Sequence, residues 1–308
     1  MERILREIAD QEIRLDLFLS RQMGLTRRQI SQAKFRDNGI CVNGVQRRIH
    51  TLLLPGDVVE IRIASGQDRS KQLVSTEGRL DVLWEDQDLL VVNKPAGLVT
   101  HPSHGHYQDT LANQVQAYAD GENQGFRVRA MGRLDKDTSG LVIFAKNQVA
   151  AARLASQREK GILSKTYLAL VSGRLKPPAG SISLPVRKMP GHLMKMEALP
   201  EGTLNAETSY RVLGYGEDFT AAEVKLQTGR THQIRVHFSS LGYPLLGDPL
   251  YGPQDMAGQS LRYLSHTALH AWKLELYHPF KKTRMLLEAP IPDDLKRLLL
   301  AADETVDL

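Results

Sequence analysis

MGRLDKDTSGLVIFAKN, residues 131–147, is the stretch of this 308-residue chain that says most about its fold. A polar turn that holds Asp135 and Thr138 runs directly into LVIFA, an apolar run that begins at Leu141. Such a run beside turn residues predicts a buried strand with a loop at its edge, and loops of this kind often hold catalytic groups. Taken alone, Asp135 and Thr138 would more simply make the local hydrogen bonds of a turn.

The segments around this strand predict further strands and two helices. One helix is expected to begin near Thr110, with Leu111 and Val115 on one face, and another to cover residues 147–160, with Gly161 at its end. Strands and helices do not alternate regularly, so the fold class expected is α+β. The strand-like segments are VLW, LLVV, TYLALV, ETSYRVL, TAAEVKL and HAWKLELY.

The N-terminal part has a different pattern, of two short helices followed by strands. The first helix would follow Asp16, and Thr26 with Gln29 three positions later resembles a capping box that opens the second. Asn43-Gly44 is a strong hairpin signal, and VVEIRI, residues 58–63, alternates as a half-exposed strand. These signals predict a compact module.

Composition shifts divide the chain into four segments. Residues 65–78 are polar and small and contain no run able to pack a core, which is typical of a linker. They would separate a module of residues 1–64 from a larger domain of residues 79–292. Residues 293–308 are expected to form a C-terminal helix and tail, with residues 301–308 frayed.

Charge and cysteine content narrow the function classes. The formal net charge is +5, and residues 21–50 hold seven Arg or Lys against one acid, Asp37. This bias favours a polyanionic partner. Cys41 is the one cysteine, so an intrachain disulfide and a thiolate metal cluster are excluded. The apolar runs are too short to span lipid and the N-terminus lacks an apolar core, which favours a cytoplasmic protein with no membrane partner.

Four blocks of sequence resemble the RluA family of pseudouridine synthases. The family's nucleophile motif, Arg-Leu-Asp, two variable residues and Thr-Ser-Gly, matches residues 133–140. The resemblance extends over residues 81–290 and is highly specific because the blocks keep the family's order. The other three blocks are LVVNKPAGLVTHPSHGH (90–106), SKTYLALVSG (164–173) and GRTHQIRVHFSSLGYPLLGDPLYG (229–252).

One position departs from that family's pattern. Gly132 stands where the RluA family most often has His, and glycine is more typical of the related RsuA family. The motifs after Asp135 still favour RluA. Gly132 therefore puts in doubt the contact that a His would make, and with it the finer substrate assignment, but not the nucleophile.

The resemblance implies an isomerase that converts uridine to pseudouridine in RNA, on a mixed, mainly antiparallel sheet flanked by helices and loops. The reaction has no redox step, so no cofactor and no metal are expected. Asp135 would be the nucleophile. Arg235 would pair with it and keep it charged when the base excludes water, although without the motif Arg235 would be read as an exposed helix residue in a weak ion pair.

The resemblance also implies roles for other residues around the flipped base. Tyr167 would stack on the uracil where the C5 proton leaves, its simpler role being a packed strand tyrosine. Arg133 would fill the hole left by the extruded base. Arg230 and Lys94 would line the site or bind backbone phosphate.

The segment from Arg14 to Ile63 resembles the S4 (αL) domain that is often fused ahead of this catalytic domain. Its basic side chains would give a salt-dependent grip on RNA, the alternative being an ordinary solvated helix face. These residues are Arg27, Arg28, Lys34, Arg36, Arg47 and Arg48.

Several alternatives stay open at this point. Large-subunit (23S) ribosomal RNA is the favoured substrate by resemblance, with tRNA as runner-up, because every phosphate backbone looks alike to basic charge. A non-catalytic RNA-binding or ribosome-assembly factor is a second reading. A monomer is the default oligomeric state. A metal hydrolase is the remaining rival, and it rests on five histidines: His101, His104, His106, His232 and His237.

Overall fold

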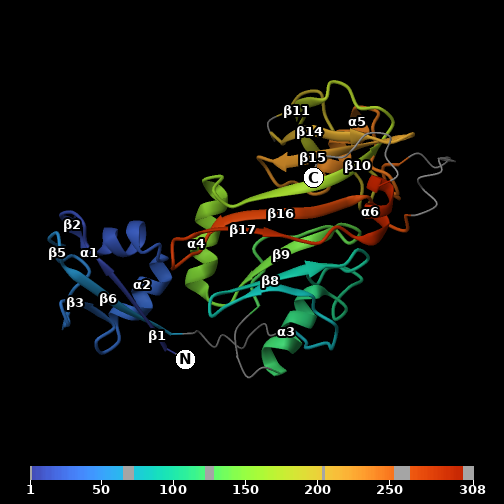
Figure 1. Cartoon of the computed structure of the whole chain (residues 1–308). Helices are drawn as coiled ribbons and strands as arrows, with labels where there is room; N and C mark the ends of the chain where they lie inside the picture. The colour runs from blue at the N-terminus through green and yellow to red at the C-terminus, as the bar shows by residue number, and fades with distance from the viewer. Residues whose placement is uncertain (1, 65–72, 122–127, 203–204, 253–263, 301–308) are drawn as a thin grey trace.

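The computed structural model describes residues 2–64, 73–121, 128–202, 205–252 and 264–300. Figure 1 shows two bodies of unequal size, a small N-terminal module in blue and a larger body built around a long sheet. Within these ranges no helix combines the length and the apolar character needed to cross a lipid bilayer.

The larger body is organised by one sheet, which has nine strands among the described residues. They are β7 (Val82–Glu85), β8 (Leu89–Lys94), β9 (Ser139–Ala145), β10 (Ser164–Ser172), β11 (Ala179–Ser183), β14 (Glu207–Tyr215), β15 (Phe219–Leu226), β16 (Leu269–Tyr277) and β17 (Arg284–Glu288). The order across the sheet is β11-β14-β15-β10-β16-β9-β8-β7, and β17 also pairs with β16. Only the β9–β16 pair is parallel in this described sheet. The expected α+β fold with a mixed, mainly antiparallel sheet is confirmed.

Helices cover both faces of this sheet, which explains why its strands are apolar on both sides. They are α3 (Leu111–Gly121), α4 (Gln148–Glu159), α5 (Gln233–Ser240) and α6 (Asp293–Leu300). α3 and α5 pack on one face, while α4 and α6 pack on the other. In β8, Leu90 and Val92 contribute to the core under α3, and Leu89 and Val91 to the core under α4. The functional side chains described below lie on the face of α3 and α5.

Local hydrogen bonds at both expected helices confirm the starts that their sequences predict. The backbone N–H and the hydroxyl of Thr110 both donate to the side-chain oxygen of Asn113 at the start of α3. The side chain of Asn147 accepts from the backbone N–H of Ala150 at 2.9 Å and so caps α4. Gly161, which follows this helix, has φ of +69°, the left-handed conformation that glycine adopts without strain.

The N-terminal module has a hydrophobic core made mainly of its own residues. Its elements are β1 (Glu2–Ile8), β2 (Ile13–Arg14), α1 (Leu15–Leu17), the π-helix η1 (Phe18–Gln22), α2 (Arg27–Lys34), β3 (Ile40–Val42), β4 (Val45–Gln46), β5 (Leu52–Leu53) and β6 (Val58–Ala64). The capping box is present, since Thr26 and Gln29 exchange hydrogen bonds at the start of α2. The hairpin at Asn43-Gly44 is also present, with positive φ at both turn residues.

The module opens with a strand, which corrects the expectation that a helix comes first. β1 pairs along its whole length with β6, from Glu2 opposite Ala64 to Ile8 opposite Val58. The sheet order β1-β6-β3-β4 therefore places the N-terminal strand at one edge. The sequence of β1 is mostly charged and does not predict a strand. The strand is formed by pairing with β6, which lies far along the chain.

The module rests on α4 and on the turn between β16 and β17 (Figure 1). The guanidinium of Arg153, in α4, donates to the backbone carbonyls of Met23 at 2.8 Å and Pro279 at 2.7 Å. It also forms an ion pair with Glu7 at 3.0 Å, and Val149 of the same helix belongs to the core of the module. One arginine therefore ties the module to the larger body.

Only part of the expected linker lies within the described residues. Residues 65–72 lie outside the described residues, as does the expected frayed tail, residues 301–308. Residues 73–78 run along α3, where Asn113 donates to the carbonyl of Val74 at 2.8 Å and Thr76 donates to the carbonyl of Gln108 at 2.6 Å. This part of the expected linker is therefore attached to the larger body.

Candidate active site

The loop before β9 presents Asp135 at the edge of the sheet. The Asp135 side chain is 17% exposed, and its backbone carbonyl accepts from the N–H of Thr138 at 3.2 Å. Gly140 follows with φ of +107°, and a Cβ there would lie 2.3 Å from the carbonyl oxygen of Ala271 in β16. Only glycine fits this close approach, so the Thr-Ser-Gly sequence lets β9 pair with β16 directly behind the loop.

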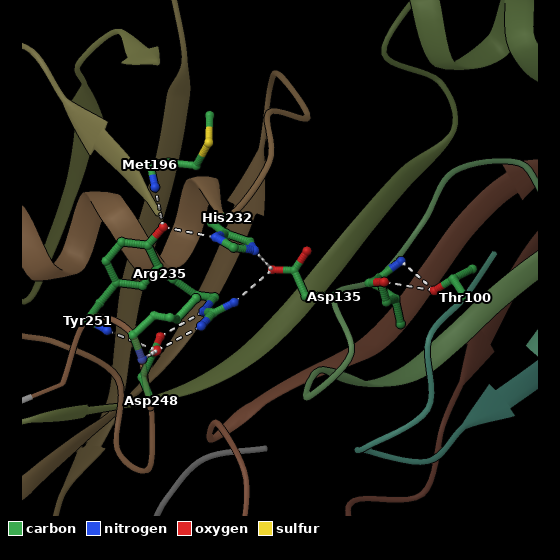
Figure 2. Close-up of polar contacts among 9 residues, drawn as sticks. Thr100, Asp135, Met196, His232, Arg235, Asp248 and Tyr251 are labelled. Carbon is green, nitrogen blue, oxygen red and sulfur yellow. Dashed lines mark hydrogen bonds and ion pairs between the residues drawn. The ribbon is translucent and has the colours of Figure 1, made fainter. Parts of the chain in front are cut away.

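The residues on both sides of Asp135 are held by buried side chains. The Thr100 hydroxyl donates to the carbonyl of Leu134 at 2.7 Å and accepts from its N–H at 3.1 Å (Figure 2). The ammonium of Lys94 donates to the carbonyl of Lys136 at 2.9 Å. The backbone of the loop is therefore fixed immediately before and immediately after the carboxylate.

Lys94 does not lie where the sequence predicted. It is 0% exposed, and its ammonium donates three hydrogen bonds, to the carbonyls of Lys136, Pro95 and Leu98. Burial lowers the pKa of Lys94 to about 7, while Asp137 opposes the shift. The three acceptors use every N–H of the charged form. The prediction that Lys94 binds RNA phosphate is wrong, because the group is inside the protein and fully occupied.

Arg235, in α5, lies between two carboxylates, as Figure 2 shows. It donates to Asp248 through Nε at 2.7 Å and Nη2 at 2.8 Å, and through Nη1 to Asp135 at 3.4 Å. Its side chain is 4% exposed, so the alternative of an exposed helix residue is wrong. Burial alone would lower the pKa of Arg235, but the hydrogen bonds and charge of Asp248 raise it. The predicted contact with Asp135 is present, but the shorter contacts are to Asp248.

Asp248 is a site residue that the sequence did not single out. It is buried and also accepts from the backbone N–H groups of Leu250 at 2.9 Å and Tyr251 at 3.1 Å. Its one signal is its place in the GDPLYG part of the family block at residues 229–252. A carboxylate with four donors is a fixed anchor for the arginine beside it.

His232 and Tyr251 are two further site residues: His232 was expected only as a possible metal ligand, and Tyr251 had no expected role. His232 Nε2 lies 3.9 Å from Asp135 Oδ2, and its Nδ1 lies 2.8 Å from the hydroxyl of Tyr251. The Tyr251 hydroxyl also accepts from the backbone N–H of Met196 at 2.8 Å. Burial lowers the pKa of His232, while the charge of Asp135 opposes that shift.

Tyr167 lies in β10 and lines the same space as Asp135. It is a buried member of the core under α3 and α5. Burial, and secondarily the negative charge of Asp135, raise the pKa of Tyr167 well above its usual range. The residue is thus both packed in a strand and part of the site, and its hydroxyl stays protonated at neutral pH.

Asp135, Tyr167 and Arg235 line a cavity of about 120 Å³, together with His232. Of the residues predicted for the catalytic site, it brings together Asp135, Tyr167, Arg235, Arg133 and Arg230. The two last arginines are exposed. The cavity therefore has a buried charged floor and a cationic rim. The basic residues of the N-terminal module do not line it: Arg27, Arg28, Lys34, Arg36, Arg47 and Arg48.

Gly132 has a conformational reason to be glycine. Its φ is +107°, a backbone conformation that is strained for residues with a side chain and open to glycine. The nearest atom that a Cβ would meet is Nη1 of Arg158, at 3.9 Å, so space is not the constraint. The backbone of the loop, rather than a neighbouring group, accounts for the departure from the family's usual His.

The histidines behind the metal-hydrolase reading do not assemble a ligand set. Both ring nitrogens of His237 are used, by Thr208 and by the carbonyl of Leu184, at 2.9 Å each. Among the described residues, one group of side chains that could ligate a metal lies close together, and it contains none of these five histidines. In that group the His278 ring is committed on both nitrogens. The geometry thus gives the metal-hydrolase reading no support. The group is Asp86, Asp88 and His278.

The chain is similar to several known proteins. A family described as RNA pseudouridylate synthase matches residues 88–240. Ribosomal large subunit pseudouridine synthase D of Nitrosomonas europaea is 42% identical over 248 residues, which cover 78% of this chain and 71% of the relative. The protein of the same name from Pseudomonas aeruginosa is 36% identical, over 86% of this chain and 84% of the relative. The solved structure of human RNA pseudouridylate synthase domain containing 4 is 26% identical, with a TM-score of 0.58 over 72% of this chain and 92% of that chain.

The chain belongs to the RluA family of RNA pseudouridine synthases, as its motifs predicted. It is an isomerase that acts on RNA and converts uridine to pseudouridine.

Proposed function

We propose that Asp135 is the nucleophile of this reaction and that the cavity beside it receives the flipped uracil. The observation that carries the proposal is the contact between Asp135 and a buried arginine at the floor of the cavity. A base that enters the cavity excludes water from the carboxylate. Arg235 keeps a positive charge 3.4 Å from Asp135, so the carboxylate has a cationic partner when the base is bound.

The reaction balances without any added group. The bond from N1 to C1′ breaks, the uracil turns, a bond from C5 to C1′ forms, and the C5 proton leaves while N1 gains one. A carboxylate suits this sequence because it can add to an electron-poor centre, or stabilise it, and then leave again. Asp135 is placed for this step because the backbone of its loop is fixed by Thr100 and Lys94.

Tyr167 is proposed to pack against the uracil ring. Its ring lines the cavity and is held in β10, which keeps its orientation fixed. Since burial raises its pKa, the hydroxyl is a phenol at neutral pH and is not a free base. The Tyr167 hydroxyl would accept the proton from C5 only if it released its own proton at the same time.

Arg133 is proposed to replace the extruded base, and Arg230 to bind backbone phosphate. Both are exposed and both line the cavity, so they lie where RNA must approach it. Extrusion of a base costs a few kcal/mol, and a planar guanidinium can stack in the vacated space and still reach phosphates.

We further propose that residues 1–64 are an S4-like RNA-binding domain ahead of a catalytic domain, residues 79–292, and a C-terminal segment, residues 293–308. The hydrogen bond from the Gln46 side chain to the carbonyl of Arg36, at 3.2 Å, joins the end of α2 to β4 and so brings basic side chains to one region. Phe35 is 80% exposed there, with the ammonium of Lys34 4.6 Å from its ring centre. An exposed aromatic ring among cations is suited to stacking on an RNA base.

We propose large-subunit (23S) ribosomal RNA as the substrate, because the names of two relatives refer to the ribosomal large subunit. tRNA is the alternative substrate, and a ribosome-assembly role without catalysis is the alternative function. The chain is proposed to act as a monomer in the cytoplasm.

The test is a base-resolution map of pseudouridine in ribosomal and transfer RNA from cells that lack the protein. The cells are complemented with wild type, with Asp135→Asn, or with Asp137→Asn as a matched control in the same loop. We expect a ribosomal site that is lost in the knockout, restored by wild type and by Asp137→Asn, and not by Asp135→Asn. A site restored by Asp135→Asn would overturn the nucleophile, and a site found only in tRNA would overturn the substrate.

A further inference from the structure

The hydroxyl of Tyr251 has two partners among the described residues, and they fix the direction of its proton. The backbone N–H of Met196 can only donate, so the hydroxyl oxygen accepts from it at 2.8 Å. The other partner, 2.8 Å away, is Nδ1 of His232. A buried hydroxyl is stable when its proton has an acceptor. The Tyr251 proton therefore points to Nδ1, which must be the unprotonated nitrogen.

That direction sets the tautomer of His232. A neutral imidazole with an unprotonated Nδ1 carries its proton on Nε2. The ring is buried, and burial lowers its pKa, so the neutral form prevails at neutral pH. Nε2 faces Oδ2 of Asp135 at 3.9 Å, as Figure 2 shows. The histidine thus presents an N–H to the carboxylate.

The backbone at His232 aims the ring in this direction. His232 precedes α5 and has φ of +55° and ψ of +20°, a left-handed conformation, and its side chain does not cap that helix. A non-glycine residue seldom adopts this conformation without a reason. Here the conformation places the ring between Tyr251 and Asp135 instead of along the helix.

The two donors to Asp135 approach the same oxygen. Arg235 Nη1 lies 3.4 Å from Oδ2, and His232 Nε2 lies 3.9 Å from that same atom. The dashed lines in Figure 2 converge on one carboxylate oxygen. Among the described residues, the other oxygen, Oδ1, has no side-chain donor. Oδ2 therefore accepts a hydrogen bond from Arg235 and faces the N–H of His232, whereas Oδ1 has no such side-chain neighbour in the described part of the chain.

We propose that His232 is a positioning residue that, with Arg235, holds Oδ2 of Asp135 and leaves Oδ1 as the oxygen that reacts. Tyr251 acts through His232, because its hydroxyl selects the tautomer that offers the Nε2 proton. The inference rests on the proposed role of Asp135 as nucleophile.

The hairpin of β12 (Val186–Lys188) and β13 (Met196–Ala198) completes this chain of contacts. Met196 opens β13, and its backbone N–H is the donor that orients the Tyr251 hydroxyl. The route from the hairpin to the nucleophile is therefore Met196 N–H to Tyr251, Tyr251 to His232, and His232 to Asp135.

The kinetic test uses total RNA from cells that lack the protein, labelled with tritium at uridine C5, so that it does not depend on which RNA is the substrate. The full-length enzyme in excess releases tritium in a single turnover. We expect His232→Ala to lower the rate at saturating enzyme about 10-fold or more, since a misplaced reacting group is costly. The enzyme concentration at half-maximal rate should change by less than about two-fold, because the loss is in the transition state.

Two conservative variants separate positioning from packing. The amide of His232→Gln reaches the place of Nε2 and should restore much of the rate. His232→Asn tolerates the left-handed backbone but ends near the place of Nδ1, so it should stay slow. A His232→Ala enzyme with the full rate, or His232→Asn faster than His232→Gln, would overturn the inference.

A spectroscopic test needs no change at His232. In the full-length protein labelled with ¹⁵N-histidine, long-range ¹H–¹⁵N correlations report which ring nitrogen carries the proton. We expect Nε2–H in the wild type and a mixture of tautomers in Tyr251→Phe. A wild-type ring with its proton on Nδ1 contradicts the inference even if every His232 variant fails to fold.

Asp135→Asn separates this inference from the function on which it rests. If Asp135→Asn is inactive while His232→Ala is as fast as wild type, the positioning role alone is overturned. If Asp135→Asn releases tritium at the wild-type rate, the nucleophile assignment fails, and the role of His232 fails with it.

Discussion

Arg235 binds Asp248 through two parallel hydrogen bonds, at 2.7 and 2.8 Å, in the buried floor of the site. The pair is bidentate, a geometry that fixes the plane of the guanidinium as well as its position. Its remaining nitrogen reaches Asp135 at 3.4 Å. The arginine that contacts the proposed nucleophile is thus itself held by a second carboxylate.

Asp248→Asn is expected to impair both stability and catalysis. The amide keeps one acceptor oxygen but removes the charge that anchors Arg235. Breaking a buried ion pair on one side destabilises a fold by about 3 kcal/mol or more. We expect a loss of that size in urea unfolding, together with slower release of tritium from uridine C5. The control is Asp137→Asn, because Asp137 is close to the proposed nucleophile in sequence but does not line the cavity. An equal effect of the two substitutions would contradict the anchor role of Asp248.

Thr100→Val is expected to loosen the loop that holds Asp135, the proposed nucleophile. The change keeps the shape of the side chain but removes both of its hydrogen bonds to Leu134. A buried polar group left without a partner costs about 1–3 kcal/mol, so the free energy of unfolding should fall by about 2 kcal/mol. Urea unfolding measures it, and Thr100→Ser, which keeps the hydroxyl, should lie near wild type. Equal stability of the Val and Ser variants would show that these bonds do not hold the loop.

Local signals account for the parts of the fold that the sequence predicted. The capping box at Thr26, the turn at Asn43-Gly44 and the caps of α3 and α4 depend on residues a few positions apart. β1 was missed because its pairing with β6 joins residues far apart in the sequence, from Ile8 and Val58 to Glu2 and Ala64. Its sequence, ERILREI, does not alternate strictly between charged and apolar residues, so it does not signal a strand without that partner.

The site residues also fall into two groups: those that a sequence motif predicted and those whose role depends on tertiary contacts. Asp135, Tyr167 and Arg235 were predicted because family motifs contain them, and the cavity brings them together. Asp248 carried no separate signal, since its role comes from the fold that brings it against α5. Lys94 was assigned to RNA because a lysine in a motif suggests phosphate binding. Its burial depends on three carbonyls that the chain assembles only after folding.

Arg153→Met is expected to release the N-terminal module from the larger body. The variant keeps an apolar side chain but removes the hydrogen bonds to Met23 and Pro279 and the ion pair with Glu7. The module keeps most of its core, so it should stay folded while it moves away. Small-angle scattering should show a larger radius of gyration than for Arg158→Met, an exposed arginine on the same helix. An unchanged radius would mean that other contacts are sufficient to dock the module.

The basic residues of the N-terminal module should set part of the salt dependence of RNA binding. Arg27 and Arg28 are exposed on α2, and each phosphate contact contributes about one unit to the slope of log affinity against log salt. The double variant Arg27→Ala/Arg28→Ala should therefore lower that slope by about two. Arg284→Ala, on β17 of the larger body, is the comparison outside the module, and it removes one positive charge. If both proteins keep the wild-type slope, the basic face of the module is a solvated surface and not an RNA contact.

Asp86 should account for part of the acid sensitivity of the fold. Burial raises the pKa of its carboxyl, but hydrogen bonds from the backbone N–H groups of Asp88 and Leu89, and from Lys281 and His278, outweigh burial and lower it to about 2. Because the carboxyl binds its proton less tightly in the folded than in the unfolded state, it stabilises the fold above about pH 4.

That contribution is lost as the pH falls from the unfolded pKa of 3.8 through the folded pKa of about 2. Asp86→Asn removes the titrating group, so the variant should be less stable than wild type at pH 7 by about 1 kcal/mol, a value reduced for partial solvent screening. The gap should close between pH 4 and pH 2, and urea unfolding at several pH values measures it. A gap that stays constant down to pH 2 would assign the loss to packing of the turn between β7 and β8 and not to the charge of Asp86.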